Sequence, residues 1–450
     1  MMVGMKLAIL GGGGFRVPLV VRALLREVDS PVTEVSLYDA DPVRLSAIAN
    51  VVAQSAAQLG GRPLPVTTTT DARAALAGAA YVFSAIRVGG LVGRVTDERV
   101  AIANGVLGQE TVGAGGIAFG LRTIPVAMAL ARTVREVAPA AWVVNFTNPA
   151  GMVTEAMSTA LGDRVIGICD SPLGLARRVA RSLGRRVEDC RIDYSGLNHL
   201  GWLHRLEDQE GDLVPRFLAD DAAVLGTEEG EIFGVEWLRS LGAVPNEYLH
   251  YYYLHREALA EQHGPGHRTR GEFLAGQQQD FFDAIAARPE SSSREWERVL
   301  AERNSTYMAA ARGVDAHRHE EDLVSGGYEG VALVLMRALA GGIPAQLILN
   351  VRAGAQVGLP EDAVAEVPCT VTAAGVSPLA TTPLDLHMQG LVSQVKAVEH
   401  ATIEAATTGS RAAAVRAFAL HPLIDSVTTA RALVRDYCAA EPAIASVLGQ

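Results

Sequence analysis

Short apolar runs alternate with amphipathic stretches through the first 190 residues of the chain. Apolar runs that predict buried strands lie at 6–10, 34–39, 80–86, 142–146 and 165–168. Helical patterns lie between them, at 18–28, at 120–137 and from Gly151 onward. Strands that alternate with helices form a parallel sheet covered on both faces, so we expect residues 1–190 to form a doubly wound α/β domain.

The pattern changes after residue 190. A strand-like segment at 193–207 is followed by helical patterns over 230–340, a β excursion at 346–372 and an alanine-rich helical end. We find no internal repeat and no low-complexity linker between the two parts of the sequence. Because 450 residues exceed the usual size of one core, we expect a second, α+β domain at 191–450, fused to the first with the site between them.

Composition narrows the function classes. Hydrophobic residues make up 49% of the chain and charged residues 20%, which is typical of a globular protein. A net charge of −11 argues against nucleic acid and anionic membranes as partners. Four scattered cysteines without a CxxC pair, an N-terminus without signal-peptide features and the lack of a membrane-length apolar run predict a soluble cytoplasmic protein.

A glycine turn follows the first predicted strand and precedes the first helix. This order lets a dinucleotide pyrophosphate bind backbone N–H groups at the helix N-terminus. The fingerprint is incomplete, because arginine replaces its third glycine, and an acid ends the second strand later than is usual. A turn without any ligand is the alternative. The candidate dinucleotide contacts are Gly11, Gly13, Gly14, Phe15, Arg16 and Asp39.

A cysteine and a histidine end two other apolar segments. Cys169 and Asp170 follow the strand at 165–168, and Asn198 and His199 interrupt the segment 193–207. One thiolate and one imidazole could form half of a divalent-metal site, with substrate oxygens and water at the other positions. The alternative is a packed thiol and a hydrogen-bonded core histidine.

Seven motifs in order carry a resemblance to a known family. They are RVGG at 87–90, GQETVGAGG at 108–116, LRTIPV at 121–126, NFTNPAG at 145–151, GLNHLGW at 196–202, PNEYLHYYY at 245–253 and LPEDAVAEVP at 359–368. Together they resemble the NAD- and manganese-dependent glycosidases of glycoside hydrolase family 4, and within it most of all the 6-phospho-β-glucosidases. The resemblance covers nearly the whole chain and implies an architecture like that of lactate and malate dehydrogenases.

The resemblance implies hydrolysis through a temporary oxidation, unlike the two-carboxylate scheme of most glycosidases. NAD⁺ takes a hydride from C3 of the sugar, which acidifies the proton on C2. A base removes that proton, the glycosidic oxygen leaves, water adds to the alkene, and the hydride returns. A divalent cation stabilises the negative charge that develops on the C3 oxygen.

The resemblance also implies roles for single residues. Cys169 and His199 match the metal ligands, and Tyr248 matches the base at C2. The alternative for Tyr248 is core packing, because other tyrosines follow it and aromatic clusters usually lie in protein cores. Asp170 matches the acid of α-specific members, whereas many β-specific members have asparagine there; it could instead cap the following helix. The anomeric specificity therefore stays open.

Arg94 and Arg270 match substrate contacts of the family, and Arg87 is a candidate to join them. Asn148 and Asn198 match contacts to sugar hydroxyls, and Glu110 is a candidate to support these contacts from behind. An arginine fork is the expected reader of a sugar phosphate, whereas a surface ion pair is the ordinary role of such arginines. The remaining histidines near the tyrosine cluster and beyond it are expected at the surface or at a homodimer or homotetramer contact. These are His250, His255, His263, His267, His317 and His319.

Three other functions remain open. The same chemistry could act on 6-phospho-α-glucosides or on unphosphorylated glycosides. A 2-hydroxy-acid dehydrogenase would share the N-terminal fold, but it would produce NADH and have no use for Cys169. A non-catalytic regulator that binds NAD or a sugar phosphate would be stabilised by its ligand without turnover.

Overall fold

The computed structural model describes residues 4–27, 29–60, 62–264, 266–306 and 327–449. In these residues one 13-stranded sheet runs through the whole molecule, in the order β10-β8-β7-β12-β11-β6-β5-β4-β1-β2-β3, with β9 and β13 beside β8 and β12. His317 and His319 lie outside the described residues.

The N-terminal half of the sheet is parallel. Its strands are β1 (Met5–Leu10), β2 (Val32–Tyr38), β3 (Val66–Thr69), β4 (Ala79–Ser84), β5 (Trp142–Asn145) and β6 (Val165–Gly167). The order β3-β2-β1-β4-β5-β6 is that of a dinucleotide-binding Rossmann sheet, with its switch point between β1 and β4. The predicted α/β fold is therefore confirmed. Strand β3 is the one strand of this half that the apolar pattern missed, because its sequence is VTTT and it lies largely exposed at the sheet edge.

The rest of the sheet is antiparallel. Its strands are β7 (Arg191–Leu197), β8 (Leu200–Asp208), β9 (Gly211–Asp212), β10 (Val244–Pro245), β11 (Ala345–Arg352), β12 (Val364–Thr372) and β13 (Gly375–Pro378). The strands β11 and β12 join the two halves, since β11 pairs with β6 and β12 pairs with β7. A boundary between domains near residue 190 stays a prediction.

Helices cover both faces of the parallel sheet. The N-terminal helices are α1 (Val17–Arg26), α2 (Pro42–Leu59), α3 (Ala72–Leu76), α4 (Gly90–Ala103), α5 (Gly113–Val137), α6 (Ala150–Leu161) and α7 (Ser171–Ser182). Alternate residues of β1 enter opposite cores: Leu7 and Ile9 pack with α1 and α2, whereas Ala8 and Leu10 pack with α5. This alternation is the period of a strand buried on both faces.

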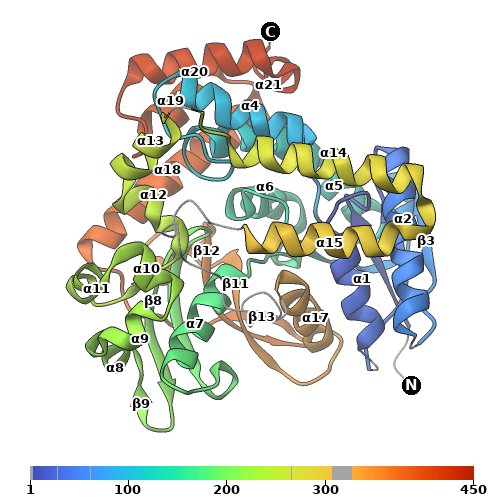
Figure 1. Ribbon diagram of the computed structural model, residues 1–450, viewed down its shortest axis with the longest axis horizontal. Helices are drawn as coiled ribbons and strands as arrows, with labels where there is room; N and C mark the ends of the chain where they lie inside the picture. The colour runs from blue at the N-terminus through green and yellow to red at the C-terminus, as the bar shows by residue number, and fades with distance from the viewer. Residues whose placement is uncertain (1–3, 28, 61, 265, 307–326, 450) are drawn as a thin grey trace.

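The later helices surround the antiparallel part and the top of the molecule (Figure 1). They are α8 (Val214–Ala219), α9 (Asp221–Leu225), α10 (Glu228–Phe233), α11 (Val235–Leu241), α12 (His250–Tyr253), α13 (His255–Gln262), α14 (Arg270–Ala287), α15 (Ser292–Ser305), α17 (Tyr328–Leu339), α18 (Leu386–Thr408), α19 (Arg411–Leu420), α20 (Val427–Ala440) and α21 (Pro442–Val447). Helices α14 and α15 lie side by side, and α15 packs on α2 of the Rossmann half.

Helix α5 corrects two expectations from the sequence. It begins at Gly113 rather than near Gly120, so the GAGG segment belongs to the helix. A Cβ on Gly115 would lie 2.1 Å from the Gln109 carbonyl oxygen, which explains why glycine occupies this close approach. By length and composition α5 could cross a membrane, contrary to our expectation, but 78% of its most apolar window is buried, which is the position of a core helix.

A buried ion pair braces the segment that carries the candidate arginines. Arg122 on α5 donates two hydrogen bonds of 2.6 Å to the two carboxylate oxygens of Asp97 on α4. The Arg122 Nε also donates to the Val88 carbonyl at 2.9 Å, in the RVGG turn. The pair therefore fixes α4 and the turn before it against the core helix.

We predict that Asp97→Asn lowers the free energy of unfolding by about 3–5 kcal/mol, because it leaves the buried Arg122 guanidinium without its counter-charge. Urea unfolding followed by circular dichroism measures the change. The matched control is Glu136→Gln, whose ion pair with Arg73 is more than half exposed on both sides, and which should change stability by less than about 1 kcal/mol. Equal effects of the two substitutions would contradict the prediction.

Candidate active site

The glycine turn after β1 is closely packed on its neighbours. Gly11 has φ +86, and a Cβ there would lie 2.5 Å from the Ala85 carbonyl oxygen. The Gly13 N–H donates to Asp39 Oδ2 at 2.8 Å, so the acid at the end of β2 is held against the turn. The turn lies at the switch point of the sheet, where doubly wound proteins bind their ligands. Glycine is thus required by geometry here, and the Asp39 carboxylate lies directly beside the turn.

The three residues after Gly13 make different contacts with the rest of the protein. The Gly14 N–H donates to the Gly11 carbonyl at 2.9 Å and shapes the turn. The Phe15 ring is buried at a centroid distance of 5.2 Å from Phe281, so only its backbone is in place to contact a dinucleotide. The Arg16 carbonyl accepts a hydrogen bond of 2.8 Å from the Tyr328 hydroxyl.

His199 lies in the tight turn between β7 and β8. Its backbone has φ +63, and its ring is buried. Its Nδ1 lies 3.1 Å from the hydroxyl of Thr111, and that hydroxyl donates to Gln109 Oε1 at 3.1 Å. Because the Thr111 hydrogen is used in this way, its oxygen accepts from Nδ1–H, which leaves the His199 Nε2 lone pair for a ligand.

Burial lowers the pKa of His199 to about 4, so the imidazole is neutral near pH 7. A neutral ring with one nitrogen already bonded is the form that binds a divalent metal. Glu110 acts in the opposite direction by favouring the charged form, but burial outweighs it. The residue therefore has the tautomer and the charge state of a metal ligand.

Cys169 lies just beyond the end of β6 and is buried. Burial raises the pKa of its thiol, and the carboxylates of Glu366 and Asp170 raise it further. The thiol is therefore protonated until a cation displaces its proton. In the described residues no group of three or more His, Cys, Asp and Glu side chains is arranged to hold a metal ion. The residues that the structure describes therefore contain no complete metal site made of protein ligands alone.

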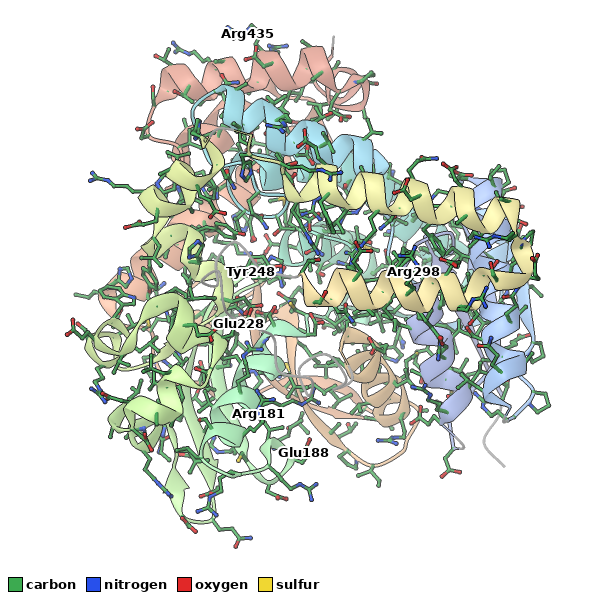
Figure 2. All side chains as sticks on the ribbon, viewed as in Figure 1. Arg181, Glu188, Glu228, Tyr248, Arg298 and Arg435 are labelled. Atoms are coloured by element: carbon green, nitrogen blue, oxygen red, sulfur yellow. The ribbon has the colours of Figure 1, made fainter. Side chains whose placement is uncertain are left out.

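Tyr248 covers the ring of His199. The two rings stack at a centroid distance of 3.7 Å and an angle of 5°. The Tyr248 N–H donates to Asn246 Oδ1 at 3.0 Å, which caps the short 3₁₀ helix Glu247–Leu249. Figure 2 places Tyr248 at the centre of the molecule, between the helices above and the antiparallel strands below. Tyr248 also interacts electrostatically with Arg94.

Positive charge gathers around one carboxylate. Glu110 Oε1 lies 2.9 Å from Arg94 Nη1, and its Oε2 lies 2.9 Å from Arg87 Nη1. Burial alone would raise the pKa of Glu110, but these arginines lower it to about 2. Arg94 is buried and also pairs with Glu98, so it is not the surface ion pair that its sequence neighbours suggested.

A further arginine at the end of α15 joins this group. The pKa of Arg303 is lowered by burial and by the charges of Arg16, Arg94 and Arg270. Arg270 begins α14 and donates to the Thr306 hydroxyl at 2.9 Å and to the Arg303 carbonyl at 3.1 Å. Arginines from four separate segments therefore face one region, with more positive than negative charge.

The polar residues at the strand ends take different positions. Asn148 Oδ1 is buried and has no hydrogen-bond partner in the described part of the chain, as expected for an amide directed at a ligand. Asn198 donates from Nδ2 to Glu366 Oε1 at 3.2 Å. Asp170 stands at the start of α7, but its side chain makes no capping hydrogen bond there. The capping role is therefore not observed.

A small cavity of about 30 Å³ lies beside these residues. Its lining includes members of four of the seven motifs, namely Thr111, Gly113, Pro149, Gly151, Asn198 and Tyr252. Segments far apart in the sequence thus meet at one place, at the carboxyl ends of the parallel strands.

Several positions differ from what the sequence predicted. His250, expected at the surface, is buried, because it follows the 3₁₀ helix inward, whereas His263 is exposed and His255 and His267 are partly so. Thr111 and Arg303 were missed. Thr111 stands in the GQET segment and could have been noted, but Arg303 belongs to no motif.

The comparisons with known proteins agree with this geometry. Residues 6–185 match the model of "Family 4 glycosyl hydrolase", and residues 194–424 match that of its C-terminal domain. The chain therefore belongs to family 4 of the glycosyl hydrolases, as the motifs suggested, and is an enzyme of that class.

Relatives with both anomeric names are similar to this chain. A Bacillus subtilis protein named "Probable 6-phospho-beta-glucosidase" is 30% identical, over 98% of this chain and 97% of its own. A 6-phospho-alpha-glucosidase of Leptotrichia buccalis is also 30% identical, over 96% of each chain. The 6-phospho-beta glucosidase of Thermotoga maritima, solved with NAD and glucose-6-phosphate, has a TM-score of 0.83 at 27% identity and covers 98% of this chain and 99% of its own. The same enzyme has also been solved with manganese, NAD+ and glucose-6-phosphate, at a TM-score of 0.81 and 27% identity over 97% of this chain and 98% of its own.

We predict that Glu110→Gln lowers the free energy of unfolding by about 3 kcal/mol at pH 7, because the lowered pKa of Glu110 is lost. The sign follows from the depressed pKa: the contribution is complete above pH 4.5 and disappears as the pH falls through about 2. Urea unfolding at pH 7, 5 and 3 should therefore show a constant difference from wild type at the first two values and a smaller one at pH 3. A difference that grows on acidification would contradict the assignment.

Proposed function

We propose that this enzyme hydrolyses 6-phosphoglucosides with bound NAD and a divalent cation, taken to be manganese. The observation that carries the proposal is the contact between Tyr248 and His199, whose rings stack at 3.7 Å, beside the buried Arg94. The residues that match a base, a metal ligand and a phosphate reader thus meet at one point. The Thermotoga enzyme solved with manganese, NAD+ and glucose-6-phosphate supports the same set of ligands.

The candidate cofactor contacts fit their proposed ligands. The glycine turn at 11–14 with Asp39 would hold NAD, and Cys169 with His199 would hold the cation. When bound, NAD would accept and return a hydride, and the cation would polarise the sugar oxygens and stabilise developing negative charge. Because His199 is neutral with Nδ1 bonded to Thr111, it can bind a cation without first losing a proton.

Tyr248 is the proposed base for the C2 proton of the sugar. A phenol has an ordinary pKa of about 10 and needs a nearby positive charge to act near neutral pH. The Arg94 guanidinium supplies one such charge at this site. The stacking on His199 fixes the ring plane, so the hydroxyl cannot swing away from the site.

The arginines Arg94, Arg270 and Arg303 are the proposed readers of the 6-phosphate. Burial lowers the pKa of Arg303, and the charges of Arg94 and Arg270 lower it further. Like charges held together are destabilising unless an anion compensates them. Glu110 pairs with Arg87 and Arg94, and Glu98 also pairs with Arg94, so these arginines are only partly compensated. A phosphate dianion is the complementary ligand, which favours phosphorylated over unphosphorylated glycosides.

Asp170 is the proposed acid for the glycosidic oxygen. Its side chain does not cap α7, so it is available for a proton transfer. This residue is also the observation that favours a second candidate, hydrolysis of 6-phospho-α-glucosides. The β-anomer is proposed first because most of the motifs resemble the β-specific members. A cytoplasmic location and a homodimer or homotetramer remain part of the proposal.

Paired nitrophenyl substrates test the function directly. We expect hydrolysis of p-nitrophenyl β-glucoside 6-phosphate with NAD⁺ and Mn²⁺, and loss of activity with a chelator. The α-linked 6-phosphate and the two unphosphorylated glucosides are the controls. Turnover of the α-linked substrate alone would replace the β assignment. Net NADH production from a 2-hydroxy acid, or ligand-induced stabilisation without any turnover, would contradict the proposal.

For Tyr248→Phe we expect loss of deuterium exchange at C2 in D₂O, by at least about 100-fold, because general-base catalysis contributes that much. Hydride exchange at C3 should persist, since the phenol is not needed for it. NMR of the recovered sugar phosphate measures C2 exchange, and C3-deuterated substrate measures the hydride step. Equal losses of both exchanges would assign Tyr248 to packing instead. The matched control is Tyr251→Phe, one turn away.

For Arg270→Ala we expect a rise in KM for the phosphorylated substrate of about 10- to 100-fold, as for loss of one charged hydrogen bond, with little change in kcat. The matched control is Arg268→Ala, whose exposed side chain donates to the Glu272 carbonyl. Inorganic phosphate as a competitive inhibitor should also weaken for Arg270→Ala. Unchanged KM and unchanged inhibition would remove Arg270 from the phosphate site.

A further inference from the structure

Two buried polar side chains lie in the sheet between the strand that leads to Cys169 and the strand that leads to His199. Asn350 on β11 and Glu366 on β12 are register partners, and their surfaces are 0% and 1% exposed. Polar groups at this depth are retained only where they are hydrogen-bonded. Because they lie between the strands that lead to the two candidate metal ligands, they are candidates to position these ligands.

The backbone links these two residues to both ligand strands. Asn350 pairs with Gly167 at the end of β6, and Glu366 pairs with Gly196 on β7. Each of these junctions is a single register pair, whereas β11 and β12 pair along their full length. The main chain therefore ties the two ligand strands to the central pair only loosely, and side chains must fix the rest.

Glu366 makes that connection with its carboxylate. Its Oε1 accepts hydrogen bonds from Asn350 Nδ2 at 2.8 Å and from Asn198 Nδ2 at 3.2 Å. Its Oε2 accepts from the Tyr194 hydroxyl at 3.3 Å. One carboxylate thus joins β11, β7 and the turn that carries His199.

Asn350 makes the connection on the other side. A Cβ placed on Gly167 would lie only 2.8 Å from the Asn350 Cβ, so the Asn350 side chain rests directly on the backbone of β6. Glycine at 167 permits this close approach just before Cys169. The position of Asn350, and through it that of Glu366, is therefore set by the cysteine strand.

The Asn198–His199 turn has an unfavourable backbone conformation that other contacts must stabilise. His199 is the one non-glycine residue with positive φ in the described ranges of the chain. Such a backbone persists only where surrounding contacts determine it. The bond from Asn198 to Glu366, the bond from His199 to Thr111 and the stacking of Tyr248 on His199 are side-chain contacts that hold the two turn residues.

We propose that Glu366 and Asn350 are positioning residues that set the place of the Asn198–His199 turn relative to Cys169, so that imidazole and thiolate can share one divalent cation. The inference rests on the proposed metal site. Glu366 acts through Asn198 and does not touch the cation. Loss of such supporting hydrogen bonds typically weakens metal binding by about 10- to 100-fold.

Cobalt(II) is a suitable probe, because its bond to a thiolate gives a charge-transfer absorption that reports Cys169 directly. We expect Glu366→Leu, titrated with Co²⁺ in the presence of NAD⁺, to bind about 10- to 100-fold more weakly than wild type. Glu366→Gln keeps an acceptor oxygen for Asn350 and Asn198 and should bind within about 3-fold of wild type, since it retains these bonds. The matched control for loss of a carboxylate is Glu361→Leu, which is exposed and should bind as wild type.

A double variant tests whether Glu366 affects metal binding through Asn198. If Glu366 acts through Asn198, Glu366→Leu combined with Asn198→Ala should lose little more affinity than the weaker single variant. Additive losses would overturn this route. Should Glu366→Leu not fold, as judged by thermal unfolding and NAD⁺ affinity, Asn198→Ala decides alone: weakened Co²⁺ binding supports the inference, and unchanged binding overturns it.

Cys169→Ser separates failure of this inference from failure of the proposed function. If wild type shows no thiolate-to-cobalt absorption, or if Cys169→Ser shows it equally, the metal site is wrong and the inference falls with it. If wild type and Cys169→Ser differ as expected but folded Glu366→Leu binds Co²⁺ within about 2-fold of wild type, the metal site stands and the positioning role alone is wrong.

Discussion

The chemistry of this site depends on how His199 is held. Its backbone is in the left-handed region, its Nδ1 is bonded to Thr111, and its ring face is covered by Tyr248 at 3.7 Å. Burial keeps the ring neutral. A flexible or protonated histidine could neither bind a cation nor hold the phenol ring in one plane. The turn between β7 and β8 therefore determines both the metal ligand and the base in the proposed mechanism.

Charge in the site is arranged around this neutral centre. On one side Glu110 lies between Arg87 and Arg94, and Arg303 joins them from α15. On the other side the thiol of Cys169 lies among carboxylates that raise its pKa. An anionic substrate is favoured on the first side and a cation on the second. The two sides together suit a phosphorylated sugar whose hydroxyls complete the shell of a metal.

Much of the fold could be predicted from the sequence, because buried parallel strands and their helices leave periodic apolar patterns. The Rossmann half follows that rule, and its exception is β3, whose exposed edge position tolerates the threonines of VTTT. The start of α5 was predicted near Gly120 rather than at Gly113, because glycine is unfavourable within helices. In α5 it instead permits so close an approach that a Cβ at Gly115 would lie 2.1 Å from a backbone carbonyl oxygen, which no pattern reveals.

The motifs predicted part of the candidate site, but they did not predict the contacts that form only when distant segments of the chain fold together. Cys169, His199 and Tyr248 stand in recognisable segments, but the stacking of Tyr248 on His199 could be seen only in the structure. Arg303 lies on a helix without a motif. Glu366 stands in the LPEDAVAEVP motif, but its contact with Asn198 arises only because β12 pairs with both β11 and β7. Such residues depend on long-range strand pairing, which local periodicity cannot report.

The central claim is that one divalent cation binds His199 and Cys169 together in the presence of NAD⁺. Pulsed electron paramagnetic resonance of the Mn²⁺-loaded enzyme tests it most directly, because a bound imidazole adds nitrogen modulation to the manganese signal. We predict this modulation in wild type, its loss in His199→Gln, and much weaker Mn²⁺ binding in Cys169→Ser. Tight Mn²⁺ binding without nitrogen modulation, or modulation that survives His199→Gln, would contradict the account.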